Sequence, residues 1–167
     1  MHDARLVNLL GAAALALTDL IVAATRLPGV STSGAAALVS LRFAPGLSVT
    51  ELGRHVGLTQ SAAARMTDSL VAAGLVTREP GAGREVAVTL TTDGVAAADR
   101  VLAARAEPLA ALLEPLTDAE RADLTALLTT ILPRVYDRVG STDLICRLCD
   151  RDTCTTDAHC PVGAAAR

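Results

Sequence analysis

Residues 48–94 read SVTELGRHVGLTQSAAARMTDSLVAAGLVTREPGAGREVAVTLTTDG. The stretch predicts a short helix, a tight turn, a second helix and a β-hairpin with a glycine-rich tip. Ser48 or Thr50 is a suitable N-cap for the first helix, and Glu51 in the first turn suits the helix dipole. Gly57 is suited to end that helix in the left-handed conformation. The order of elements is that of a helix-turn-helix followed by a wing.

The second helix is the most informative element of this unit. Thr59 is a suitable N-cap, and the helix is expected to run from Gln60 to about Ala73. Helical spacing predicts one buried stripe and one exposed stripe. The buried stripe comprises Ala62, Met66, Leu70 and Ala73, and the exposed stripe comprises Ser61, Ala64, Arg65 and Asp68. Such a helix reads base edges in the major groove of DNA.

The predicted hairpin supplies further cations. Its first strand begins at residues 75–76, its turn is formed by Gly81, Ala82 and Gly83, and residues 85–90 (EVAVTL) alternate as a half-buried strand should. Arg78 and Arg84 are expected to meet DNA phosphates or base edges. The predicted DNA-binding residues are therefore Thr59, Gln60, Ser61, Ala64, Arg65, Arg78 and Arg84.

The segments TELGRHVGLTQSAAARMTDSLVAAGLV and LTTDG resemble the winged helix of the MarR family, bacterial transcription regulators named for multiple antibiotic resistance. The resemblance extends from roughly residue 5 to residue 139. It implies a homodimer joined by the N-terminal and the last two helices. In the family an Asp-x-Arg element of the wing holds an Arg for the minor groove. Here Arg84 matches the Arg, whereas Ala82 replaces the Asp, so Arg84 is expected to be less rigidly held.

The flanking segments are expected to be helical and to form a dimer. Residues 4–26 are expected to form a long apolar helix. Further helices are expected at residues 32–43 and 93–113, and the capping box of Thr117 and Glu120 opens the last helix. A signal peptide or membrane span is the alternative for the first helix, but Asp19 interrupts an apolar run that is then too short for a bilayer. We expect no membrane contact, and burial against a second subunit rather than a monomer.

The predicted fold is mainly α with a small β-wing, a winged helix-turn-helix flanked by N- and C-terminal dimerisation helices. Four regions are expected: N-terminal dimerisation helices (1–45), the DNA-binding region (46–94), C-terminal dimerisation helices (95–140) and a Cys-rich tail (141–167). The net charge of −3 argues against a strongly basic DNA-binding protein. A winged helix used only for protein contacts is the alternative, but the positions of the arginines favour DNA and imply few phosphate contacts.

The tail holds all four cysteines of the chain. Cys146, Cys149, Cys154 and Cys160 follow the spacing C-x2-C-x4-C-x5-C, and His159 precedes the last of them. The spacing favours zinc held by four Cys, or by three Cys and His159. An iron–sulfur cluster on the four Cys is the second interpretation, and redox-active thiols are the third. The spacing alone leaves the three open.

These observations predict a cytoplasmic, homodimeric transcription regulator, a repressor that binds a palindromic operator in double-stranded DNA. Its DNA affinity is expected to respond to a small-molecule effector or to the Cys site. The alternative is a metal or redox sensor in which the four-Cys tail is the effector site. No Ser/His/Asp set, paired carboxylates or phosphate loop stands out, so no enzymatic activity is expected.

Overall fold

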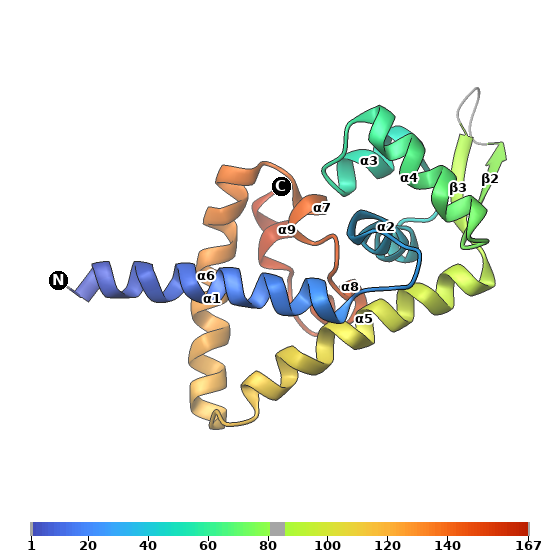
Figure 1. The fold of residues 1–167 in the computed structure, drawn as a ribbon. Coiled ribbons are helices and arrows are strands. Elements are labelled where there is room, and N and C mark those ends of the chain that lie inside the picture. The colour runs from blue at the N-terminus through green and yellow to red at the C-terminus, as the bar shows by residue number, and fades with distance from the viewer. Residues whose placement is uncertain (1, 81–85, 167) are drawn as a thin grey trace.

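The computed structural model describes residues 2–80 and 86–166. It is mainly helical with a small antiparallel sheet, which confirms the predicted fold class (Figure 1). The elements are α1 (His2–Ala24), α2 (Thr32–Phe43), β1 (Leu47–Ser48), α3 (Val49–His55), α4 (Gln60–Ala72), β2 (Val76–Pro80), β3 (Val86–Leu90), α5 (Thr92–Leu113), α6 (Asp118–Val139), α7 (Thr142–Ile145), α8 (Arg151–Thr155) and α9 (Pro161–Ala165).

Local signals place most helix starts where the sequence predicts them. Ser48 caps α3 in a capping box with Glu51, and Thr117 caps α6 in a second capping box with Glu120. Thr59 caps α4 by accepting a hydrogen bond from the N–H of residue 62. The chain turns between α3 and α4 at Gly57, whose φ of 71° is in the left-handed region that glycine adopts without strain.

The winged helix surrounds a core of small and aliphatic side chains. Helix α2 lies at its centre, with a continuous buried run from Gly34 to Leu41. Around it pack Leu52 of α3, Leu70 of α4, Val88 of β3 and two alanines of α5, Ala97 and Ala98. Alanine-rich faces let helices approach closely, which explains how a chain with one Phe and one Tyr builds a dense core.

The wing belongs to a three-stranded sheet in the order β1-β3-β2. Strand β3 pairs antiparallel with β2, from Val76 opposite Leu90 to Pro80 opposite Val86. The edge strand β1 was not predicted; its two residues, Leu47 and Ser48, lie opposite Val88 and Ala87. The extra strand ties the start of α3 to the base of the wing.

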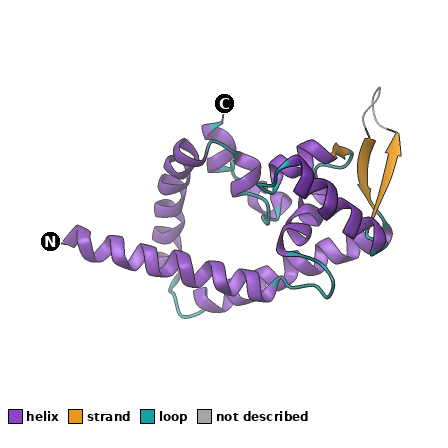
Figure 2. Ribbon diagram, turned by 45° about the horizontal axis from the view of Figure 1, so that its top comes forward, coloured by secondary structure: helices purple, strands orange, loops and turns teal. Residues whose placement is uncertain are grey.

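Three long helices and the C-terminal segment make the rest of the molecule. Helix α1 extends away from the winged helix, α5 runs beneath it, and α6 stands apart from it (Figures 1 and 2). The short helices α7–α9 lie between α6 and the winged helix (Figure 1). Within the chain, the extensive contacts of α6 are with α9 and α7. The Cys-rich tail therefore lies between α6 and the winged helix and connects them.

Candidate nucleic-acid interface and cysteine cavity

Helix α4 presents a polar N-terminal face to solvent. Gln60, Ser61 and Arg65 are exposed, and Ala64 is half-buried. The hydroxyl groups of Thr59 and Ser61 lie 3.4 Å apart at the start of the helix. The predicted reading residues of α4 thus share one accessible face.

The buried face of α4 differs from the prediction by a small rotation. Ala63, Met66, Thr67 and Leu70 are buried, whereas Ala62 is half-buried and Ala73 is exposed, so the predicted stripe is wrong at both ends. The reason is the helical period: positions i, i+3, i+4 and i+7 share one face, whereas a strict spacing of four drifts around the helix. The buried hydroxyl of Thr67 donates to the carbonyl of Ala63 at 2.8 Å.

Close packing fixes the angle between α3 and α4. A side chain added at Gly53 would put its Cβ 2.8 Å from the Cβ of Ala63. The two helices therefore touch where both residues are small. This contact, together with the buried Leu52, holds α4 at the surface with its polar face outward.

The wing contributes one cation among the described residues, and it is paired. Arg78 on β2 contacts Asp68 on α4, with Nη1 2.8 Å from Oδ1. Both side chains remain accessible, at 36% and 62% exposure. The prediction that Arg78 faces DNA is compatible with its place beside α4, but the ion pair offsets its charge. Arg84 and Ala82 of the predicted Asp-x-Arg position lie outside the described residues.

The LTTDG segment has a defined structural role. Thr91 caps α5 by accepting from the N–H of Gly94, and its own hydroxyl donates to the carbonyl of Gly74 at 2.7 Å. A Cβ at Gly94 would lie 1.9 Å from the carbonyl oxygen of Leu75. Only glycine fits this crossing of the wing base with α5.

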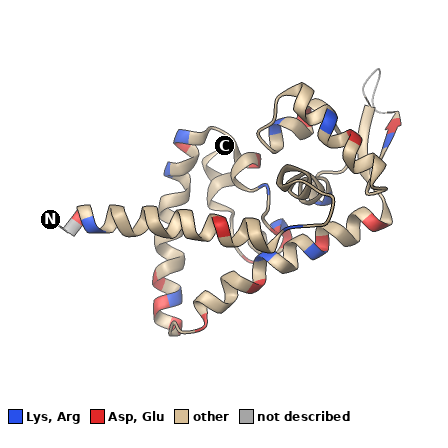
Figure 3. Ribbon diagram, viewed as in Figure 1, with Lys and Arg blue, Asp and Glu red and all other residues tan. Residues whose placement is uncertain are grey.

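Helices α1 and α6 expose apolar faces. The side chains that are at least one-third exposed include Leu6, Val7, Leu9, Leu10, Leu15 and Leu20 on α1 and Leu127, Leu128, Ile131, Val135 and Val139 on α6. Charged residues are sparse on α1 and on the middle of α6 (Figure 3). Within the described part of the chain, no side chain of α6 is buried. Faces of this size require a covering surface.

Among the described residues, α1 is long and apolar enough to cross a membrane by length and composition. The apolar run on one side of Asp19 is too short to cross a bilayer, as the sequence predicts, but the whole of α1 is long enough. An apolar helix that packs against another subunit has the same composition.

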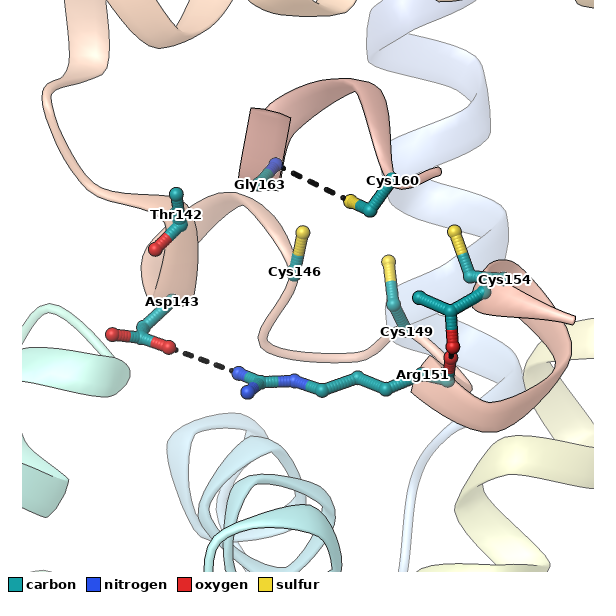
Figure 4. A pocket seen from close by; sticks show the side chains of 9 residues that line it. Thr142, Asp143, Cys146, Cys149, Arg151, Cys154, Cys160 and Gly163 are labelled. Atoms are coloured by element: carbon teal, nitrogen blue, oxygen red, sulfur yellow. Dashed lines mark hydrogen bonds and ion pairs between the residues drawn. The ribbon is translucent and has the colours of Figure 1, made fainter. Parts of the chain in front are cut away.

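The four cysteines converge on one cavity of about 220 Å³ (Figure 4). Cys146 and Cys149 lie in the turn after α7, Cys154 on α8, and Cys160 at the N-cap of α9. All four are free thiols. His159, the predicted alternative ligand, is exposed and is not among the cavity-lining residues. No three His, Cys, Asp or Glu side chains within the described ranges are placed to hold a metal ion directly.

The thiols differ in acidity. A hydrogen bond from Cys146 lowers the pKa of Cys149 to about 6, and the cations Arg105, Arg151 and Arg147 act in the same direction. The same hydrogen bond and burial raise the pKa of Cys146. Burial also raises the pKa of Cys154. Cys149 is thus the more acidic partner of Cys146, and Arg151 lines the same cavity.

The side chain of Asp143 connects the cysteine cavity to the helix-turn-helix. Arg151 lines the cavity and contacts Asp143 of α7 at 3.0 Å. The other oxygen of Asp143 lies 3.4 Å from Nε2 of His55, in the last turn of α3. Leu144 packs on the adjacent turn, where a Cβ at Gly57 would be 3.1 Å away. The sequence gives no signal for this contact, because it joins segments almost ninety residues apart.

A second cavity, of about 420 Å³, lies between α1, α2, α3, α5 and the tail. Apolar side chains such as Ile21, Val56 and Leu144 line it, together with Arg105 and Arg147. Cys149 borders both cavities. This cavity joins the long helices, the helix-turn-helix and the tail at one place.

Comparisons with known proteins agree with this geometry. A sequence profile of the MarR family matches residues 28–85. No curated protein sequence matches the chain. The MarR family protein Rv2887 of Mycobacterium tuberculosis, in complex with salicylic acid, is 30% identical, with a TM-score of 0.57 over 74% of this chain and 93% of that chain.

Other solved structures are similar as well. Rv1404 of Mycobacterium tuberculosis is 26% identical, with a TM-score of 0.67 over 83% of this chain and 94% of that chain. A MarR family protein from Bacillus stearothermophilus is 25% identical, with a TM-score of 0.72 over 80% of this chain and 95% of that chain. The likeness thus extends well beyond the helix-turn-helix to the flanking helices.

Proposed function

Because the chain belongs to the MarR family of transcription regulators, we propose that it is a cytoplasmic repressor that binds a palindromic operator as a homodimer. The proposed activity is DNA binding and includes no catalysis. The observation that carries the proposal is the exposed, N-capped face of α4, held outward by the packing of Gly53 on Ala63.

Helix α4 is the proposed reading helix. We infer that its exposed N-terminal residues Gln60 and Ser61 approach base edges in the major groove, as those of recognition helices do. Arg65, one turn further along the same face, supplies a long donor suited to guanine. Thr59 and Ala64 complete the contact surface. In the wing, Arg84 is proposed to contact the backbone beside the groove. Arg78 is proposed to face the same backbone, with its charge offset by the ion pair with Asp68.

The apolar faces of α1 and α6 are the proposed dimer interface. Two copies that cover these faces hold their α4 helices at a fixed separation. Half-sites of a palindrome are read when the two helices lie about 34 Å apart, one turn of DNA. Whatever changes the angle between the long helices and the winged helix therefore changes operator affinity.

The electrostatics predict a modest affinity for non-specific DNA. The chain carries a net charge of −3, and Asp68 offsets Arg78 at the edge of the proposed interface. Few phosphates are therefore neutralised on binding, and the dependence of affinity on salt is expected to be shallow. Specificity must then come mainly from base contacts of α4.

The test is Arg65→Ala, compared with Arg100→Ala as a matched control that removes the same charge from an exposed site on α5. An operator is first selected from a random DNA pool by the wild-type protein. Loss of the guanine contact by Arg65→Ala is expected to weaken binding to it by roughly 1–3 kcal/mol. Equal operator affinity for both variants refutes α4 as the reading helix.

The second cavity is the proposed site of a small-molecule effector. Its apolar lining and two arginines suit an apolar organic anion, and one relative was crystallised with salicylic acid. A ligand here touches the long helices, α3 and the tail together, so it is placed to change their relative angle. Calorimetric titration with salicylate as the probe is expected to show binding that Arg105→Ala weakens. No heat of binding with the wild-type protein contradicts this assignment for that class of anion.

A further inference from the structure

The cysteine cavity is larger than a site for one ion. Zinc holds thiolates at about 2.3 Å, which places tetrahedral sulfur atoms about 3.8 Å from one another. In the described parts of the chain no three donor side chains are gathered in this way. Instead the four thiols come from three separate segments and surround a cavity of about 220 Å³ (Figure 4). A group with several metal atoms fits this arrangement better than a single ion.

The donors are of one kind. The cavity-lining residues include all four cysteines, whereas His159 lies outside it. Four thiolates are the ligand set of [2Fe–2S] and [4Fe–4S] clusters. The sulfur of Cys160 also accepts a hydrogen bond from the N–H of Gly163 at 3.4 Å. Hydrogen bonds to ligating sulfur are among the features by which proteins tune such clusters.

The surroundings favour a negatively charged group. Four thiolates bring more negative charge than the iron–sulfur core neutralises, so the whole cluster is anionic. Arg151 lines the cavity, and Arg105 and Arg147 line the neighbouring cavity that Cys149 also borders. Opposite charges at short range stabilise an anion in a partly buried site.

We propose that Cys146, Cys149, Cys154 and Cys160 bind one iron–sulfur cluster per chain. The proposal follows from the convergence of four thiols on a shared cavity, its size and its three neighbouring arginines. It is independent of whether the chain binds DNA.

The position of the cluster gives it a regulatory consequence, which rests on the proposed function. A cluster fixes the turn after α7, α8 and the start of α9 relative to one another. Helix α9 packs on α6, and α7 contacts α3 through Asp143 and Leu144. With the cluster bound, the segment from α7 to α9 thus holds the helix-turn-helix at a fixed angle to α6. Loss of the cluster allows that angle to change.

The first measurement is made on the full-length protein, purified anaerobically without an affinity-column metal. The expected protein is brown and contains iron and acid-labile sulfide in equal amounts, either two or four of each per chain. Cys149→Ser is expected to lose both. His159→Ala is the matched control, from the same segment but outside the cavity, and is expected to keep both.

Three results overturn the proposal. They are one zinc per chain without sulfide, a disulfide among the four cysteines in the anaerobic protein, and four freely titratable thiols after anaerobic incubation of the full chain with ferrous iron and sulfide. The wild-type analysis requires no substitution, so misfolding of Cys149→Ser does not affect it.

The second measurement tests the coupling. Cluster-loaded and cluster-free wild-type protein are compared for operator affinity, and a difference of about 5-fold to 150-fold is expected. His55→Ala, which lies outside the cavity, is expected to keep its iron and to lose most of that difference, because the link from α3 to Asp143 is cut. Equal affinities with and without the cluster refute the coupling while leaving the cluster assignment intact. Loss of binding by Arg65→Ala checks the proposed function separately.

Discussion

Replacing Asp68 by Asn is expected to tighten DNA binding. In the structure Asp68 holds Arg78 at 2.8 Å, and both side chains are accessible. Exposed ion pairs of this kind contribute at most about 1 kcal/mol to stability. The substitution therefore leaves the fold intact while it frees one cation beside α4 and removes one anion that phosphates repel.

The size of the effect follows from counterion release. One additional phosphate contact steepens the plot of log affinity against log salt concentration by about 0.9. Lowering the salt from about 200 mM to about 50 mM should therefore raise the affinity of Asp68→Asn about 3.5-fold more than it raises that of the wild type. Fluorescence anisotropy with labelled operator, measured across this range, gives both slopes.

Two further variants make the test specific. Asp99→Asn changes the charge equally and breaks a comparable exposed pair, Arg42–Asp99 at 3.1 Å, between α2 and α5. It is expected to leave the salt slope unchanged. Adding Arg78→Ala to Asp68→Asn should return the slope to that of the wild type. If Asp68→Asn and Asp99→Asn behave alike, Arg78 does not face DNA and the wing base lies outside the interface.

Three other outcomes are expected. Gly94→Ala should destabilise the protein by about 1–3 kcal/mol or more in urea unfolding, because its Cβ meets the carbonyl of Leu75, whereas Gly11→Ala, with open space around it, should not. Leu128→Glu on the exposed face of α6 should yield monomers in light scattering and lose operator binding; a stable dimer would place the interface elsewhere. Hydrogen bonds from Ser48 lower the pKa of Glu51 below its ordinary 4.5. The charged Glu51 therefore stabilises the fold above about pH 4.5, and this stabilisation is lost as the pH falls through the lower pKa of the folded state. In acid unfolding, Glu51→Ala should lack this pH-dependent loss of stability.

Sequence patterns predicted the elements whose signals are local. Ser48, Thr59 and Thr117 cap helices because each side chain bonds an N–H only three residues away. The start of α4 is therefore determined within a few residues. Its buried stripe was misplaced at Ala62 and Ala73, since the exact rotation of a helix depends on what packs against it. Strand β1 was missed because two residues carry no periodicity and depend on pairing with β3.

For the tail, sequence spacing predicted that the four cysteines share one site, but not where that site lies in the fold. Four cysteines in fifteen residues suggested one site, and the structure brings all four to one cavity. By its spacing, His159 could replace a cysteine as a ligand. Only the fold shows that His159 is exposed and lies outside the cavity lining. The contacts of Asp143 with His55 and Arg151 join distant segments, so no local pattern reveals them.

The tail also bears on how the molecule keeps its shape. Leu148, between Cys146 and Cys149, packs against buried residues of α2 and α5 in the core. Helix α6 makes its extensive contacts within the chain with α9 and α7. A single subunit thus positions the exposed face of α6 relative to α4 through the cysteine segment. In a dimer built on α6, the distance between the two reading helices then depends on that segment. In the proposed dimer, a group that orders or loosens this segment is therefore expected to change operator affinity.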